Sequence, residues 1–481
     1  MSTSAAKARV LTAGVARAII TPPVGIRMIG YTVQECLSDG VDRELTATAL
    51  VLTDGRLKVV LIACDLVFLQ PPLVDAIRQS VARRLEISPD NVLINCSHTH
   101  LGPMLPGWQP CSADEMAVQN HYLAVLEDAL VGVAAMADAR RQPARIGAGR
   151  GSAPLGINRR EKLPDGRVVI GENFEGAVDH DVHVLRIDDM QGSPIATVMA
   201  AAAHTVVLGP KTSLLSPDYV GPAREIVERS TGALSLFFQG AAGNVNPRCG
   251  IGSGGPEQFD DRDRLGAMLG GEVLKTWALI RTHNRHGPRR IVQSVATVSV
   301  WDYEPTAETT LEHFSLATRR LTLALSRLPD RATAEQKLAT HRRELADARS
   351  SGASLGKLNV LEKLVAWAEL VLATIDAGQN PPTRNLEFFA LRINDVGIVA
   401  VSGEPFAELG LEVKRRSPLP HTLFLGYSNG CIGYLPTPQA FSEGGMEVHE
   451  SYMNYMLPAP LTTEWGPAVI ETSLELLNSL G

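Results

Sequence analysis

The chain of 481 residues has room for about three average domains, although one large α/β unit can also reach this length. Its residues are 45% hydrophobic and 20% charged, which is typical of a globular protein with a sizeable core. The formal net charge of −7 and the lack of a long basic run argue against nucleic acid as a partner.

The cysteines and the N-terminus bear on where the protein works. No two of the six cysteines are spaced as Cys-x-x-Cys, which excludes a thiolate zinc knuckle. Residues 1–9 are not followed by a hydrophobic signal core, and no segment is long and apolar enough to cross a bilayer. We therefore expect a soluble, reduced, cytoplasmic protein without a stable membrane anchor.

Strand-like and helix-like segments alternate along the first 300 residues and return after residue 380. Strands are predicted at residues 46–52, 58–64, 92–96, 179–187, 194–203, 233–238, 292–300, 386–393, 397–401 and 422–426. Helices are predicted at residues 72–85, 121–137, 221–229 and 260–280 and directly after Pro405, whereas residues 154–160 are predicted to form a loop. This order predicts an α/β fold with mixed, largely parallel sheets flanked by helices.

The composition changes between residues 305 and 379, where leucine, alanine, arginine and glutamate dominate. Helical spacing in residues 311–328, 333–349 and 355–375 predicts two or three antiparallel helices inserted into one α/β body, residues 1–304 and 380–481. Because apolar helix faces need a partner, we expect the insertion to cover a pocket mouth or to form a contact between subunits of a homo-oligomer.

Chemically capable residues follow one predicted strand after another. His98 and His100 follow the strand at 92–96, and residues two apart in extended chain point the same way. The other strand-end candidates are Asp65, His204, Asn244, Asn246, Glu404 and Tyr434. Ligand sites of open α/β sheets gather beyond the carboxyl ends of the strands, so these residues predict a metal site of nitrogen and oxygen ligands. The alternative is that each one caps a helix, forms a turn or packs in a loop.

Five stretches also resemble the neutral/alkaline non-lysosomal ceramidases, as a divergent bacterial-type member matching their catalytic N-terminal domain. Residues 97–103, Ser-His-Thr-His-Leu-Gly-Pro, are similar to the family's Thr-His-Thr-His-Ser-Gly-Pro. The other four are Asn158 with Arg159 (Asn-Arg-Ser-Pro), His204 (a zinc histidine after a strand), residues 403–406 (Pro-Gly-Glu-Phe) and residues 429–437 (Asn-x-Tyr-x-x-Tyr-Ile-Thr-Thr). Their order and rough spacing agree over most of the chain.

The resemblance implies roles for these positions. Zn²⁺ would be held by His98, His204, Glu404 and Tyr434. His100 and Arg159 would face the substrate and its developing oxyanion, and the strand-end residues Asp65 and Asn246 complete the predicted catalytic set. The reaction implied is attack of zinc-activated water on an amide carbonyl, carried out by the α/β body.

The sequence departs from the ceramidases near the predicted site. Asn246 stands where they carry a catalytic serine, and an amide can donate a hydrogen bond to an oxyanion but cannot act as a nucleophile. Arg248 would suit a substrate carboxylate, and Trp108 would enclose a compact apolar group. The family's immunoglobulin-like domain and secretory signal have no counterpart in the sequence.

We therefore expect a zinc-dependent hydrolase of a small soluble amide rather than of ceramide. One alternative is a metal-dependent esterase, lactonase or sugar-directed enzyme that uses the same metal site. The other is a catalytically inactive scaffold whose helical insertion binds a partner.

Overall fold

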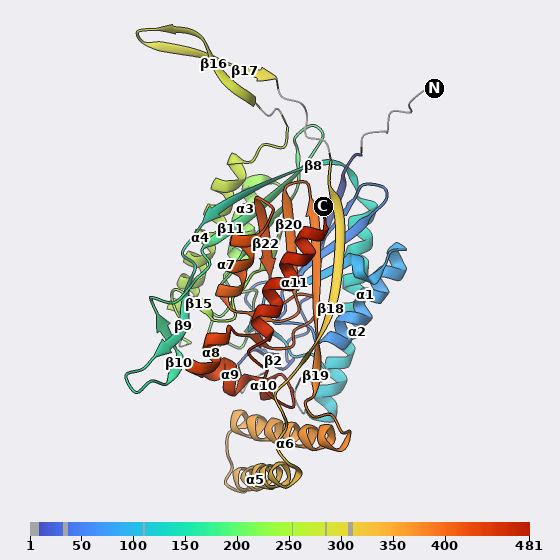
Figure 1. Ribbon diagram of the computed structural model, residues 1–481, viewed down its shortest axis with the longest axis vertical. Coiled ribbons are helices and arrows are strands. Elements are labelled where there is room, and N and C mark those ends of the chain that lie inside the picture. Colours follow the sequence, from blue (N-terminus) through green and yellow to red (C-terminus); the bar gives the residue numbers. More distant parts are fainter. Residues whose placement is uncertain (1–8, 32–36, 109–110, 253, 284–285, 306–310) are drawn as a thin grey trace.

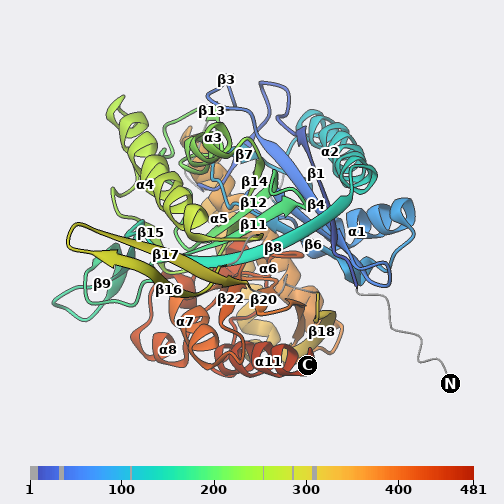
Figure 2. The same cartoon turned by 90° about the horizontal axis from the view of Figure 1, so that it is seen from above.

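The computed structural model describes residues 9–31, 37–108, 111–252, 254–283, 286–305 and 311–481 (Figure 1). Residues 1–8, on which the prediction about the N-terminus falls, and residues 306–310, at the predicted start of the insertion, lie outside the described residues. Two sheets stack face to face, and helices cover the outer face of each, so that the body has four layers (Figure 2).

The larger sheet has eight strands in the order β14-β12-β11-β8-β1-β4-β5-β6. Their bounds are β1 Thr12–Ile19, β4 Thr46–Thr53, β5 Lys58–Cys64, β6 Val92–Cys96, β8 Gln142–Ser152, β11 Asp181–Asp189, β12 Pro194–Ala201 and β14 Leu234–Gln239. The helices on its outer face are α1 Pro71–Leu85, α2 Ala113–Ala139, α3 Val220–Thr231 and α4 Glu257–Leu279.

The second sheet has the order β18-β19-β20-β22, with bounds Phe314–Ala324, Thr383–Ile393, Val396–Val401 and His421–Leu425. Helices α7 (Ala407–Arg416) and α11 (Trp465–Ser479) cover its outer face. Its inner face packs on the larger sheet, where Phe389 and Ile398 share one core cluster with Leu61 and Phe238. The remaining elements are β2 Met28–Ile29, β3 Gly40–Val41, η1 Pro89–Asn91, β7 Gly102–Pro103, β13 Leu214–Leu215, β21 Glu404–Pro405, β23 Tyr434–Leu435, α8 Pro438–Glu443, α9 Met446–His449 and α10 Ser451–Asn454.

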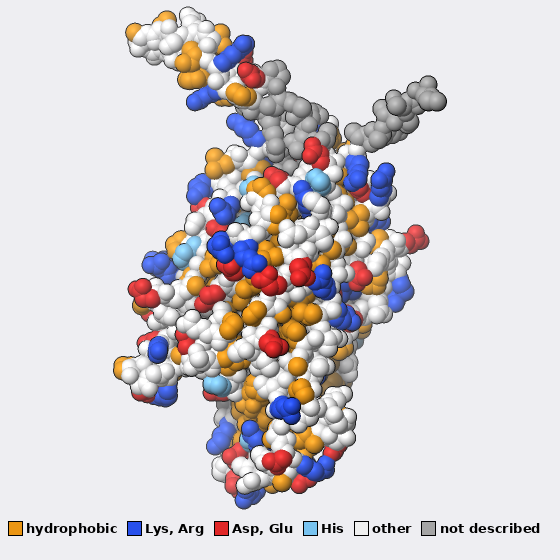
Figure 3. All heavy atoms as spheres, in the orientation of Figure 1, with side chains coloured by type: hydrophobic (Ala, Val, Ile, Leu, Met, Phe, Trp, Pro, Cys, Tyr) orange, Lys and Arg blue, Asp and Glu red, His pale blue; other side chains and the backbone are white. Residues whose placement is uncertain are grey.

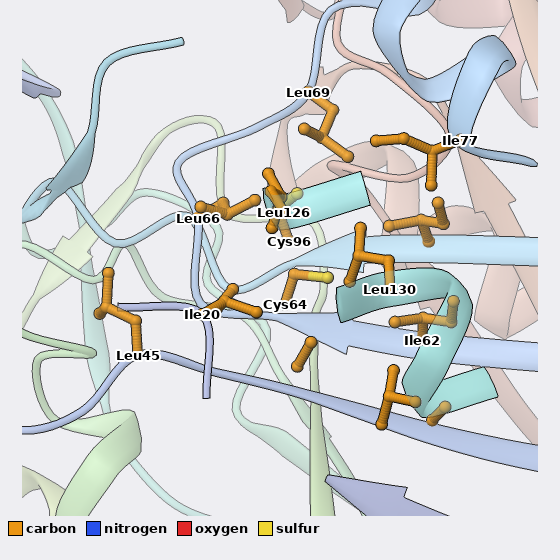
Figure 4. Packing of buried hydrophobic residues seen from close by; sticks show 14 of the residues in the cluster. Ile20, Leu45, Ile62, Cys64, Leu66, Leu69, Ile77, Cys96, Leu126 and Leu130 are labelled. Carbon is orange, nitrogen blue, oxygen red and sulfur yellow. The ribbon is translucent and has the colours of Figure 1, made fainter. Parts of the chain in front are cut away.

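Burial explains why the central strands form where the sequence is almost continuously apolar. Every residue of β4 is buried, as expected for a strand that is covered on both faces. On the helix side, Cys64 and Cys96 of neighbouring strands lie in one apolar cluster with Leu126 and Leu130 of α2 (Figure 4). The five cysteines in the described part of the chain are all free thiols.

The structure confirms the mixed α/β class but not the largely parallel pairing. Five of the seven neighbouring strand pairs in the larger sheet are antiparallel. Parallel pairs in the two main sheets are β5–β6, β12–β14 and β20–β22, each joined by one crossover helix. Short links such as residues 54–57 can only return the chain antiparallel, and parallel pairing needs a long crossover.

Residues 311–328 do not form the predicted helix. Phe314–Ala324 is strand β18, which pairs with β19 over its whole length, so tertiary pairing overrides a helix-like composition. The two later helices are confirmed as α5 (Arg331–Ser350) and α6 (Leu355–Asp376), which form a hairpin at the lower end of the body (Figure 1).

Two further segments differ from the predictions. The single strand predicted at 292–300 is a β-hairpin of β16 (His286–Val295) and β17 (Val298–Pro305), which projects from the body (Figure 3). The loop predicted at 154–160 contains strand β9 (Gly156–Lys162), which lies between β10 (Val168–Asn173) and β15 (Val245–Pro247). Among the described helices, none combines the length and apolar composition needed to cross a membrane.

Gly243 sits where the loop after β14 touches the second sheet. A Cβ there would lie 2.5 Å from the Glu404 carbonyl oxygen and 2.9 Å from that of Pro405. Gly243→Ala is therefore expected to lower stability by about 1–3 kcal/mol through overpacking. Gly132→Ala, in α2 with open space around it, should instead raise stability by about 0.5–1 kcal/mol. Calorimetric unfolding of both variants checks this, and a Gly243→Ala midpoint at or above wild type would contradict it.

Candidate metal centre

The carboxyl ends of five strands bring the predicted residues together. His98 follows β6, His204 follows β12, and Asn246 lies in β15 just after β14. Glu404 follows β20, and Tyr434 comes after β22. Glu404 and Tyr434 are direct partners in the short parallel pair β21–β23. The strand-end pattern therefore places residues from both sheets around one point.

Two histidines are held with one ring nitrogen facing this point. His98 Nδ1 lies 2.8 Å from the Val67 carbonyl oxygen, and His204 Nδ1 lies 2.7 Å from that of Ala242. Each Nδ1 must therefore carry the proton and donate it, which leaves the Nε2 lone pair free. Fixing the tautomer through the distal nitrogen in this way is typical of metal-binding histidines.

Glu404 completes the set. Its side chain is fully buried, and Oε2 lies 3.4 Å from His98 Nε2 and 3.6 Å from His204 Nε2. Oε1 accepts a hydrogen bond from the Tyr455 hydroxyl, whereas Oε2 has no hydrogen-bond partner within the described part of the chain. A buried carboxylate oxygen facing two nitrogen lone pairs is electrostatically incomplete, and a metal cation satisfies all three atoms. The residues therefore fit a metal ion.

His100 lies beside this pair. Its Nε2 is 3.1 Å from His98 Nε2, and the three imidazoles can each offer one ligand atom within 4.8 Å of the others. Burial lowers the pKa of His98 and lowers the pKa values of His100 and His204 further, so all three rings are neutral near pH 7. Neutral imidazole is the form that binds a metal.

The nearby thiol does not join the ligand set. Cys431 Sγ lies 3.9 Å from Glu404 Oε1. Burial, with Glu404 nearby, raises the pKa of the Cys431 thiol well above its ordinary value, so the thiol stays protonated. The available ligands are nitrogen and oxygen atoms, as predicted.

Arg159 brings a buried positive charge to the same place. Its Nη1 lies 3.3 Å from His204 Nε2 and 3.4 Å from Asn246 Oδ1. Its Nε donates to Glu447 Oε1 at 2.9 Å, while Arg160 Nη1 binds the other oxygen of the same carboxylate. Glu447 thus fixes the Arg159 guanidinium against the metal centre.

A cavity of about 360 Å³ opens above these residues. His98, His100, His204, Arg159, Asn246 and Tyr434 line it, and Trp108 stands in its wall as predicted. The other walls are largely apolar, formed by Met28, Ile29, Val67, Phe68, Met104, Ile170, Val206 and Ile251. The site therefore combines a polar floor with apolar sides.

Two predicted residues are not part of this site. Both Asp65 carboxylate oxygens bind the Arg224 guanidinium, at 2.8 and 2.7 Å, and Thr46 donates to Oδ2, so Asp65 forms a buried structural ion pair. Arg248 is exposed and is not one of the described cavity-lining residues, so its predicted contact with a substrate is wrong. Asn244, a strand-end candidate, instead caps α7 by accepting from the Ala407 backbone amide.

Other residues at the site could not be predicted from the sequence. Glu447 positions Arg159 from 288 positions away, and Tyr455 binds Glu404 from a short helical region that reads as mixed sequence. The Tyr427 ring packs on His98 with centroids 4.3 Å apart. The one usable signal was the density of tyrosines after the last strand.

Substitution separates the structural carboxylate from the metal ligands. Asp65→Asn should destabilise the protein by about 3–5 kcal/mol, because Arg224 loses its buried partner, yet the variant should still bind metal stoichiometrically. His204→Ala should lose most of the metal with a smaller loss of stability. Metal analysis together with thermal unfolding distinguishes the two. Full metal content in His204→Ala would refute the ligand assignment.

Comparisons with known proteins agree with this geometry. The model of the neutral/alkaline non-lysosomal ceramidase N-terminal region matches residues 11–250. Neutral ceramidase A of Dictyostelium discoideum is 26% identical over 282 residues, which are 54% of this chain and only 39% of that protein.

Two solved structures share the fold. Neutral ceramidase from Pseudomonas aeruginosa superposes with a TM-score of 0.66 at 19% identity, over 98% of this chain and 74% of that one. A ceramidase complexed with C2 gives a TM-score of 0.68 at 17% identity, over 98% of this chain and 75% of that one. The predicted resemblance is confirmed, and the chain belongs to the neutral/alkaline non-lysosomal ceramidase family of hydrolases.

Proposed function

We propose that this chain is a zinc-dependent hydrolase that cleaves the C–N bond of a compact amide. The observation that carries the proposal is the unpartnered, buried Oε2 of Glu404, which faces the Nε2 atoms of His98 and His204 at the floor of a cavity. Membership of the ceramidase family supports the choice of an amide bond. The nitrogen and oxygen ligand set supports zinc.

His98, His204 and Glu404 would hold the ion, with Tyr434 as the fourth ligand across the β21–β23 pair. Bound zinc would supply a Lewis acid and a nucleophile that is available at neutral pH. The remaining work falls to the chain's own residues. Arg159 and Asn246, 3.4 Å apart, would donate hydrogen bonds to the oxygen that gains charge, and His100 Nε2 would carry the proton to the leaving amine.

The cavity supports a compact substrate. Its volume of about 360 Å³ is near the small end of the range of about 300–1,000 Å³ that is usual for ligand sites. Ile170, Ile251 and Met446 narrow it from different elements. A single short acyl or aryl group fits such a space better than the two long chains of ceramide.

The substrate prediction is tested with zinc-loaded protein on two sets of compounds. We expect turnover of N-acyl amino acids and aryl amides, and little turnover of ceramide presented in detergent. Zinc removal by a chelator should abolish the activity, and added zinc should restore it. Robust ceramide cleavage without activity on the soluble amides would contradict the compact-substrate proposal, and no turnover of either set would contradict amide hydrolysis.

Arg159→Met tests oxyanion stabilisation. Loss of one donor at such a position typically lowers kcat by about 10²–10³ with a small change in KM. Arg160→Met is the matched control, because Arg160 shares the Glu447 carboxylate but is not one of the described residues that line the cavity. We expect kcat of the Arg160 variant to stay within about threefold of wild type. Equal losses in both variants would show that Arg159 acts only through the ion-pair network.

A further inference from the structure

Helix α6 presents one unusual residue to the body. Asn359, Lys363 and Trp367, at four-residue spacing, are 8%, 4% and 5% exposed. Residues four apart lie on one helix face, so these three form the stripe that packs against the body. Such a stripe is normally apolar, and a lysine in it must bury its charge.

Two members of the stripe have polar partners. Asn359 Oδ1 accepts from Arg27 Nη1 at 3.1 Å, and Trp367 Nε1 donates to the Leu457 carbonyl oxygen at 2.8 Å. Lys363 Nζ has no hydrogen-bond partner within the described part of the chain. Its one close contact is with the Trp108 indole, whose centroid lies 3.9 Å away.

This contact stands at the wall of the active-site cavity. Trp108, Asn359 and Arg27 all line the cavity, and the Trp108 ring packs edge-on against Phe68 and Tyr455. Tyr455 in turn binds Glu404 at the metal centre. Lys363 therefore lies one aromatic layer from the cavity and on the same helix face as a lining residue.

Charges around Lys363 leave it without a carboxylate. Glu115 pairs with Arg27 through Nε at 2.8 Å, and Glu450, which also lines the cavity, is exposed to solvent. Burial lowers the pKa of Lys363 to about 7. An ammonium group on an aromatic face gains less than a charge-assisted hydrogen bond would give, so the position is ready for an anion.

We propose that Lys363, with Arg27 and Asn359, forms a subsite at the cavity mouth for an anionic group of the substrate, of which a carboxylate is the simplest. The flexible lysine stem lets the ammonium swing past Trp108 to meet that group. Cleavage of the same ligand rests on the proposed function, whereas its binding at the mouth does not. The subsite replaces Arg248 as the cation that recognises a carboxylate.

Matched ligands test the charge. N-hexanoylglycine and its methyl ester carry the same amide but differ by one negative charge. Binding to zinc-loaded protein is followed by tryptophan fluorescence, with Trp108→Phe used to isolate the Trp108 signal. The wild type should bind the acid about tenfold more tightly than the ester, and Lys363→Met should remove that preference while ester binding stays the same.

Controls separate this role from packing. Methionine fills the space of the lysine stem without its charge, so Lys363→Met should unfold at the same or a higher temperature than wild type. Arg248→Met, which removes an exposed cation, should change neither dissociation constant. If the wild type binds acid and ester equally, or if Lys363→Met weakens both ligands together, the subsite is refuted. Loss of acid binding in Lys363→Met without turnover of either ligand would instead overturn amide hydrolysis and leave the subsite standing.

Discussion

A buried carboxylate oxygen without a partner is the constraint around which the structure is arranged. Glu404 is fully buried, and its Oε2 faces the unprotonated nitrogens of His98 and His204. The two Nδ1 atoms are tied to backbone carbonyl groups, so neither ring can turn to donate a proton. Charge at this depth is stable only with a cation, so the protein builds a place for a metal ion before it builds anything for a substrate.

The stacked sheets make that place possible. Three helical crossovers, through α1, α3 and α7, produce the parallel pairs whose carboxyl ends meet at one edge. Asn95 binds Gly426 and Ser428 across the two sheets, and the close approach at Gly243 holds the loop after β14 against Glu404. Ligands that are 306 positions apart, His98 and Glu404, are therefore fixed by backbone contacts rather than by each other.

Much of this site could be predicted, because strand-end position is a local property. His98, His204, Glu404 and Tyr434 each follow an apolar run that ends abruptly, and the family motifs mark the same residues. The same rule misled for Asp65, whose side chain turns to Arg224 instead of toward the cavity. Glu447 and Lys363 gave no local signal, because their roles depend on partners contributed by distant segments. The strand at 314–324 was missed for the same reason, since its partner β19 lies across the helical hairpin.

The most direct test of the metal centre is anomalous X-ray diffraction from crystals of the zinc-loaded protein, recorded on both sides of the zinc absorption edge. The account predicts one strong peak between His98 Nε2, His204 Nε2 and the unpartnered oxygen of Glu404, and no such peak in crystals of Glu404→Gln. A peak elsewhere in the molecule, or an empty position between these three atoms at full zinc occupancy of the protein, would contradict it.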